Sequence, residues 1–154
     1  MKKYISYLAS ILMPKNSVAK TDNFKDATDA YNKSDYTKAI ELFRPLAIEG
    51  NTAAQWYLGW MYKNGEGLIQ DYKEAVNLYR LAAEQGHAKA QSNLGFMYAI
   101  GQGVTKDYVC AHMWCNLAAS NGHKIARDNL DKIAKGMTSS QIDEAQNMAR
   151  DCKT

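Results

Sequence analysis

The sequence has little proline and no long hydrophobic run. Only two prolines, Pro14 and Pro45, occur among its 154 residues. Because proline interrupts helices, its scarcity leaves nearly all of the chain after residue 23 free to form helix. Alanine, leucine, glutamine and lysine, which favour helix, are frequent there. We therefore expect an all-α protein.

The chain also lacks any run of like charge. Its formal net charge of +3 comes from 19 basic and 16 acidic residues that are scattered along the sequence. No basic stripe alternates with aromatic residues, which is the pattern typical of nucleic-acid-binding surfaces. A nucleic-acid partner is therefore not predicted.

The first nineteen residues differ in composition from the rest. They comprise a positively charged start (residues 1–3), a mostly apolar stretch (4–13) and the small residues Ser17, Val18 and Ala19. This is the outline of a secretory signal peptide. The apolar stretch is only about half as long as a membrane-spanning helix, so no transmembrane anchor is predicted. We expect a periplasmic or secreted protein; the alternative is a cytoplasmic protein in which residues 1–19 form an N-terminal helix.

The sequence has only three cysteines, and they do not show whether the protein is exported. Cys110 and Cys115 are five residues apart on a predicted helix, so their side chains point about 140° apart and a bond between them is not expected. One of them could bond to Cys152 after export, or all three could be free thiols. Both alternatives stay open.

The main feature of the sequence is a repeat of thirty-six residues. Residues 52–87 and 88–123 align without a gap and are identical at sixteen positions. The same frame extends into 23–51 and 124–151, so the domain spans 23–151 with two complete repeats between partial ones. A fixed period in the thirties is typical of a solenoid of helical pairs.

Each repeat is predicted to contain two helices, over about 52–63 and 71–85 in the first full copy. Asp71 and Glu74 form a capping-box pattern at the start of the second helix, and Gly86 ends it. The small residue Gly59, inside the first helix, predicts close approach of a neighbouring helix, because a mid-helix glycine costs about 1 kcal/mol relative to alanine. The predicted buried positions are Ala54, Leu58, Met61, Tyr62, Ala75, Leu78, Ala82 and, in part, Tyr79.

The ends of the domain depart from this pattern. Pro45 lies inside the helix that corresponds to 71–85 one repeat earlier, and we expect it to kink that helix. After Lys135-Gly136, residues 138–141 (TSSQ) form another capping-box start. The helix that follows carries one apolar stripe, Ile142, Ala145, Met148 and Ala149. We expect it to cap the last hydrophobic face, which a solenoid would otherwise expose.

The glycine pairs Gly65-x-Gly67 and Gly101-x-Gly103 resemble phosphate-binding loops when viewed alone. A dinucleotide site needs a third glycine and a P-loop needs a lysine, and both follow a strand. Neither glycine pair has these features, and Glu66 would repel a phosphate. We therefore expect these glycines to supply positive φ in the loop between the paired helices. No cofactor is predicted.

Both full repeats carry "AxxxLGxMYxxGxG" followed by "DYxxAxxxxxLAAxxGH". On these motifs the chain resembles the Sel-1-like repeat family, a relative of the tetratricopeptide repeat, over residues 23–151. The segments "DYVCAHMWCNLAASNGH" and "MTSSQIDEAQNMARDC" are similar to the terminal portion of short exported bacterial members. The resemblance implies a right-handed α-α superhelix, a solenoid of helical pairs that ends in a C-terminal capping helix.

Metal binding is not predicted. Cys110, His112 and Cys115 are at i, i+2 and i+5, so they splay around the helix, whereas a zinc-binding helix offers ligands three or four residues apart. His87 and His123 are one repeat apart and each follows a helix-ending glycine. We expect these two histidines to cap the next helix or to face solvent.

Catalysis is the minority interpretation. Cys115 and His112 are three residues apart on one helix and could form a nucleophile and its base. Some cysteine-rich members of the family have been proposed to bind or hydrolyse β-lactams, which makes a small hydrolase or ligand-binding protein that uses these two residues the alternative function. The paired cysteines of those members are absent here, and a buried cysteine usually packs as a small hydrophobe. No catalytic residue is predicted.

The favoured function is non-catalytic protein–protein interaction, as an adaptor or regulatory scaffold. Solenoids present a concave face that suits peptides or partner helices, and the first-helix positions that do not repeat are free to specify a partner. The predicted partner-binding residues are Tyr57, Trp60, Asn93, Phe96 and Asn129. The alternative is that Trp56 and Trp60 only pack against the preceding unit. A monomer is favoured over an obligate oligomer, although a structural or self-associating module is a third interpretation.

Overall fold

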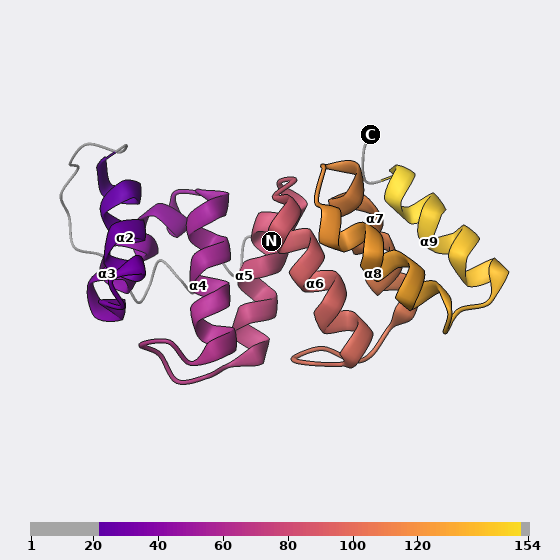
Figure 1. Cartoon of the computed structure of the whole chain (residues 1–154), viewed down its shortest axis with the longest axis horizontal. Coiled ribbons are helices and arrows are strands. Elements are labelled where there is room, and N and C mark those ends of the chain that lie inside the picture. The colour runs from indigo at the N-terminus through magenta and orange to yellow at the C-terminus, as the bar shows by residue number, and fades with distance from the viewer. Residues whose placement is uncertain (1–21, 152–154) are drawn as a thin grey trace.

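The computed structural model describes residues 22–151, which form eight helices and no strand (Figure 1). The predicted all-α class is confirmed. The predicted signal peptide at 1–19, and Cys152, lie outside the described residues. The helices are α2 (Asp22–Asn32), α3 (Tyr36–Ile48), α4 (Thr52–Asn64), α5 (Tyr72–Glu84), α6 (Ala88–Ile100), α7 (Tyr108–Ser120), α8 (Lys124–Ala134) and α9 (Ser139–Asp151).

The helices are stacked as successive pairs along the long axis of the molecule (Figure 1). Helices α2–α3, α4–α5 and α6–α7 are paired, and the second helix of each pair also contacts the first helix of the next pair. Each pair therefore buries its apolar faces only against its neighbours, as in a solenoid. Within residues 22–151, no helix is both long and apolar enough to cross a membrane.

Every second helix of a pair begins at an aspartate. Asp35, Asp71 and Asp107 each accept a hydrogen bond from a backbone N–H in the first turn of α3, α5 and α7. The predicted cap at Asp71 is confirmed, but only half of the capping box forms. The Asp71 N–H donates to the Tyr62 carbonyl over 3.0 Å, so it is not available to the Glu74 carboxylate.

The first helices begin at a second set of caps with the same period. Asn51, His87 and His123 accept hydrogen bonds from the backbone N–H three residues later, over 2.9, 3.2 and 3.3 Å. The histidines accept through Nδ1, so the prediction that they cap the next helix is confirmed. An asparagine amide oxygen and an imidazole nitrogen thus fill the same role in successive repeats.

The glycine loops follow from the stacking of the pairs. Gly65 and Gly67 have φ of 70° and 69°, which confirms the predicted positive φ. A Cβ on Gly67 would lie 2.5 Å from the Tyr36 Cβ, and one on Gly103 would lie 2.4 Å from the Tyr72 carbonyl oxygen. Each loop therefore packs directly onto the start of the second helix in the preceding pair, which only glycine permits.

Close helix crossings occur where the repeat places a glycine inside the first helix. A Cβ on Gly59 would lie 2.8 Å from the Tyr79 ring, and one on Gly95 would lie 2.6 Å from the Cys115 sulfur. Tyr79, which the sequence predicts to be partly buried, is completely buried, because its ring fills the space over Gly59. The other predicted core positions are buried, except that Tyr62 is half-buried.

A buried amide network joins successive pairs. Gln55 donates to the Ala47 carbonyl over 3.0 Å, and Gln91 donates to the Ala83 carbonyl over the same distance. The Gln91 side chain in turn accepts a hydrogen bond from Asn121. Both glutamine side chains are almost fully buried, and both form hydrogen bonds. This explains why a polar residue recurs at this position next to the buried apolar residues of each first helix.

The first helical pair contains a proline, and the stack ends in a capping helix. Helix α3 continues through Pro45 to Ile48, with Pro45 on its exposed side. Helix α9 packs against α7 and covers the end of the stack, as predicted, through a cluster around Met113, Leu117, Ala145 and Ala149. Its capping box is complete: the Thr138 N–H donates to Gln141 Oε1, and the Gln141 N–H donates to Thr138 Oγ1.

Candidate functional site

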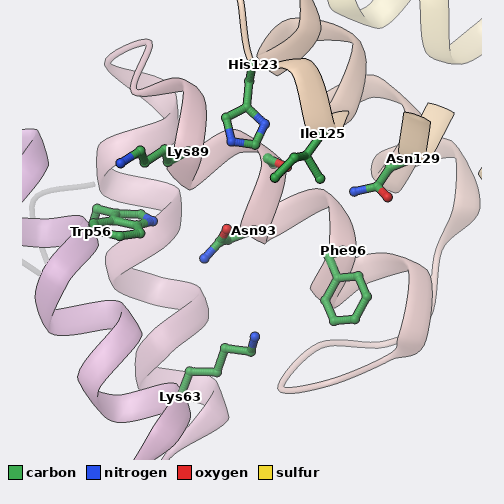
Figure 2. A pocket seen from close by; sticks show the side chains of 9 residues that line it. Trp56, Lys63, Lys89, Asn93, Phe96, His123, Ile125 and Asn129 are labelled. Atoms are coloured by element: carbon green, nitrogen blue, oxygen red, sulfur yellow. The ribbon is translucent and has the colours of Figure 1, made fainter. Parts of the chain in front are cut away.

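A cleft of about 450 Å³ lies across the first helices of three successive units (Figure 2). We call it the α4–α6–α8 cleft. It is lined by Trp56, Lys63, Lys89, Ser92, Asn93, Phe96, His123, Ile125 and Asn129. Because the repeat places equivalent positions of successive helices side by side, residues thirty-six apart, such as Asn93 and Asn129, face the same space. Its volume is in the range of protein ligand pockets.

The walls of the cleft include exposed apolar side chains. Phe96 is 43% exposed and Ile125 is 63% exposed, although both are large hydrophobic residues. Trp56 is half-buried and packs against the core cluster between α5 and α6. Exposed apolar residues that gather in one cleft are typical of interaction sites.

Two lysines stand over the aromatic side chains of the cleft. The Lys63 Nζ lies 5.3 Å from the Trp60 ring centroid and 5.5 Å from the Phe96 ring centroid. The Lys89 Nζ lies 5.0 Å from the Trp56 ring centroid. Such contacts stabilise an exposed ammonium by about 0.5–1 kcal/mol and hold both charges at the cleft.

Two residues that line the cleft have a buried donor without an acceptor among residues 22–151. The Trp56 Nε1 and Asn93 Nδ2 atoms are buried and form no hydrogen bond within the described residues. Burial raises the pKa of the nearby Tyr79 phenol, and the Asn93 amide opposes that shift, yet the two groups do not reach hydrogen-bonding geometry. Both nitrogen atoms are closed to solvent, and a buried donor without an acceptor costs about 1–3 kcal/mol.

His123 contributes a third donor. Its Nδ1 accepts the Ala126 N–H, so the neutral ring carries its proton on Nε2. Burial lowers the pKa of His123, and the Lys89 charge lowers it further. The imidazole is therefore neutral at pH 7 and offers one N–H.

The structure brings three of the five predicted binding residues together. Asn93, Phe96 and Asn129 line the cleft, and all three project into it in Figure 2. Trp60 lies beside the cleft, linked to it through Lys63. Tyr57 packs away from it, with its ring stacked on Phe43 at 4.7 Å between centroids, among the core residues of the first two pairs.

Trp56 and Trp60 pack differently from each other. Trp56 contacts the cluster of its own and the following unit instead of the preceding one. Trp60 lies near Tyr31 of the preceding unit, whose hydroxyl donates to Glu66. Six further lining residues are absent from the predicted set: Trp56, Lys63, Lys89, Ser92, His123 and Ile125. Lys89 and Ile125 have no sequence signal other than their place on a first helix.

Among the described residues, Cys115 and His112 are both buried and share no hydrogen bond. Cys115 is completely buried, and burial raises the pKa of its thiol to about 12. His112 is also buried; its Nδ1 has no partner within the described residues, and burial lowers its pKa. A protonated thiol out of reach of substrate cannot attack it, because the thiolate is the nucleophile. Residues 22–151 hold no group of three or more potential ligands arranged to bind a metal ion.

A second cleft of about 240 Å³ lies between α5 and α7. It is bordered by Trp114 and Leu117 and by the amide pair Gln91 and Asn121. Those amides already bond to each other over 3.0 Å, so this cleft offers fewer free polar groups than the larger one.

Comparison with known proteins agrees with this architecture. A family model for the Sel1 repeat matches residues 32–51, 52–87 and 88–123. Among solved structures, a protective antigen of uropathogenic Escherichia coli that displays an SLR fold is 29% identical, with a TM-score of 0.82. The alignment covers 98% of this chain but 32% of that one, so this chain spans about a third of the antigen's length.

A Sel1 repeat protein from Oxalobacter formigenes is 34% identical, with a TM-score of 0.66, over 71% of this chain and 86% of that one. No curated protein matches the chain.

Proposed function

The chain belongs to the Sel1 repeat family, whose members are typically protein-interaction scaffolds, and on that premise we propose that it is a non-catalytic adaptor or regulatory module. The observation that supports this best is the α4–α6–α8 cleft, where side chains of three successive repeats gather. The partner is a protein or peptide, and the module acts as a monomer.

The proposed binding residues are Asn93, Phe96 and Asn129, with Trp60 at the edge of the cleft. Asn93 and Asn129 can bond to a peptide backbone, and Phe96 offers an exposed ring. We retain Tyr57 as an indirect contributor, because its stack on Phe43 holds α4 in place.

The test is capture of partners from the native host. The full chain is compared with the double variant Phe96→Ala/Asn129→Ala and with Ile69→Ala, whose side chain is 91% exposed in a loop away from the cleft. We expect the double variant to lose the captured protein and Ile69→Ala to retain it. Equal capture by all three would contradict the proposed cleft.

We also propose that the module acts in the periplasm or outside the cell, after removal of residues 1–19. Sequencing the mature N-terminus tests this, because an intact Met1 would contradict export.

A further inference from the structure

Among the described residues, the lining of the α4–α6–α8 cleft carries positive charge and no carboxylate, and this bears on the chemistry of its partner. Helices α4 and α6 contain no aspartate or glutamate. Helix α8 has Asp128 and Asp131, but neither lines the cleft. A cleft that holds charge of only one sign discriminates against partners of that sign.

Within residues 22–151, no carboxylate neutralises the lysine charges. Among the described residues, the ammonium groups of Lys63 and Lys89 form no ion pair, and their contacts are with the rings of Trp56, Trp60 and Phe96. Aromatic faces hold an ammonium in place but leave its N–H groups available to an anion. The two charges therefore produce a positive potential over the cleft.

His123 adds a neutral donor to the lysines of the cleft. Trp56 Nε1 can only donate, and the buried Asn93 Nδ2 has no acceptor among residues 22–151. His123 uses its Nδ1 to cap α8, which leaves Nε2–H as the free group. Of these donors, the His123 N–H is the one that an occupant can reach, because the Trp56 and Asn93 nitrogens are fully buried.

Apolar side chains flank the donors. Phe96 and Ile125 stand on neighbouring helices at 43% and 63% exposure, and Figure 2 shows both at the cleft around Asn93. This surface suits an apolar side chain next to an acidic one. A nucleic acid is a poorer match, since the 19 basic residues are dispersed among 16 acidic ones instead of forming a track for a phosphate backbone.

We propose that the α4–α6–α8 cleft binds an acidic segment of a partner protein, with one carboxylate at Lys63, another at Lys89, and an adjacent apolar side chain on Phe96 and Ile125. This inference rests on the proposed function, because it specifies the partner that the cleft would accept. Removing the acidic groups from the segment removes the charge attraction but keeps the apolar contact.

The test is selection of a displayed library of random dodecapeptides on the immobilised full chain. We expect enrichment of peptides in which aspartate or glutamate neighbours a large apolar residue. Synthetic copies with each acid replaced by its amide should bind at least about tenfold more weakly in fluorescence anisotropy, as expected for a lost charge-assisted hydrogen bond.

Charge-reversal variants localise the effect. Lys63→Glu/Lys89→Glu should abolish binding of the acidic peptides. Lys38→Glu/Lys73→Glu changes the net charge equally, at exposed lysines on second helices away from the cleft, and should bind as the wild type does. Circular dichroism of each variant shows whether it remains folded.

Three outcomes would overturn the inference. Enriched peptides that are neutral or basic, yet lose binding in Phe96→Ala, would remove the acidic preference and leave the proposed cleft function standing. Acidic peptides that bind both double variants equally would place their site elsewhere. If no peptide is enriched, or if a single-stranded oligonucleotide competes as well as the peptide, selective recognition of a protein segment fails.

Discussion

A methyl group added to Gly103 would lie 2.4 Å from the carbonyl oxygen of Tyr72, a residue of the preceding helical pair. The loop glycine of one repeat thus touches the backbone of another, and the distance between the two pairs depends on the absence of a side chain. The same relationship holds between Gly67 and Tyr36 one repeat earlier.

Gly103→Ala should destabilise the fold by about 3 kcal/mol or more, because positive-φ strain adds to overpacking between pairs. Gly122→Ala is the matched control, since Gly122 has φ of 85° and a Cβ there would have nothing within 4 Å. It should lose only about 1–2 kcal/mol. Urea denaturation followed by circular dichroism measures both, and equal losses would show that the contact with Tyr72 does not matter.

Gln91→Met should destabilise the protein by about 1–3 kcal/mol. The substitution keeps the length of the side chain but removes the hydrogen bond to the Ala83 carbonyl and the acceptor for Asn121. Gln146 occupies an exposed position on α9, so Gln146→Met should change the free energy of unfolding by less than about 0.5 kcal/mol. If the two variants are equally stable, the buried amide network contributes nothing measurable.

Stability should fall as the pH drops from about 7.5 to about 5. Burial lowers the pKa of His87, His112 and His123 below the usual 6.5, so the unfolded chain binds more protons than the folded one. The contribution of these histidines is fully present above about pH 6.5 and is lost as the pH falls through their folded-state pKa values. Protonation of Nδ1 also removes the caps of α6 and α8, which are worth about 1 kcal/mol each.

The control for this pH effect comes from the repeat itself. Asn51 caps α4 at the position that His87 and His123 occupy in the next two units. The variant His87→Asn/His123→Asn should keep both caps and lose most of the pH dependence, while His112 retains its share. An unchanged slope of unfolding free energy against pH would show that the caps are not its source.

Cys115 should be almost inert in the folded protein. With Cys110 and Cys152 replaced by serine, labelling by N-ethylmaleimide at about pH 8 should be at least about a hundredfold slower than in concentrated urea, because burial raises the thiol pKa to about 12 and blocks access. Mass spectrometry after timed quenching measures this. Labelling at the rate of the unfolded chain would revive the cysteine as a candidate nucleophile.

Much of the fold is predictable from spacing alone. The glycine pairs, the aspartate caps and the small residue at Gly59 are local requirements of backbone conformation or of close approach, so they recur every thirty-six residues and can be recognised without coordinates. The capping box at Thr138 and Gln141 is predictable for the same reason, since its partners are three residues apart.

The candidate site is less predictable, because its members come from three helices. Asn93, Phe96 and Asn129 can be named as non-repeating positions on first helices, but Tyr57 satisfies the same criterion and packs on Phe43 instead. Whether such a residue faces the cleft or the core depends on how its helix is rotated relative to the helices on either side. The residue pattern within one helix does not contain that rotation.

The sequence by itself determined the period, the helices, their caps and the glycines that set their spacing, since each depends on residues close together in the chain. Only the tertiary structure decided that Lys63, Lys89 and Ile125 line one cleft, and that Cys115 is buried and packs against Gly95. Those facts depend on how neighbouring pairs are rotated and packed, which is set by contacts between residues about one repeat apart.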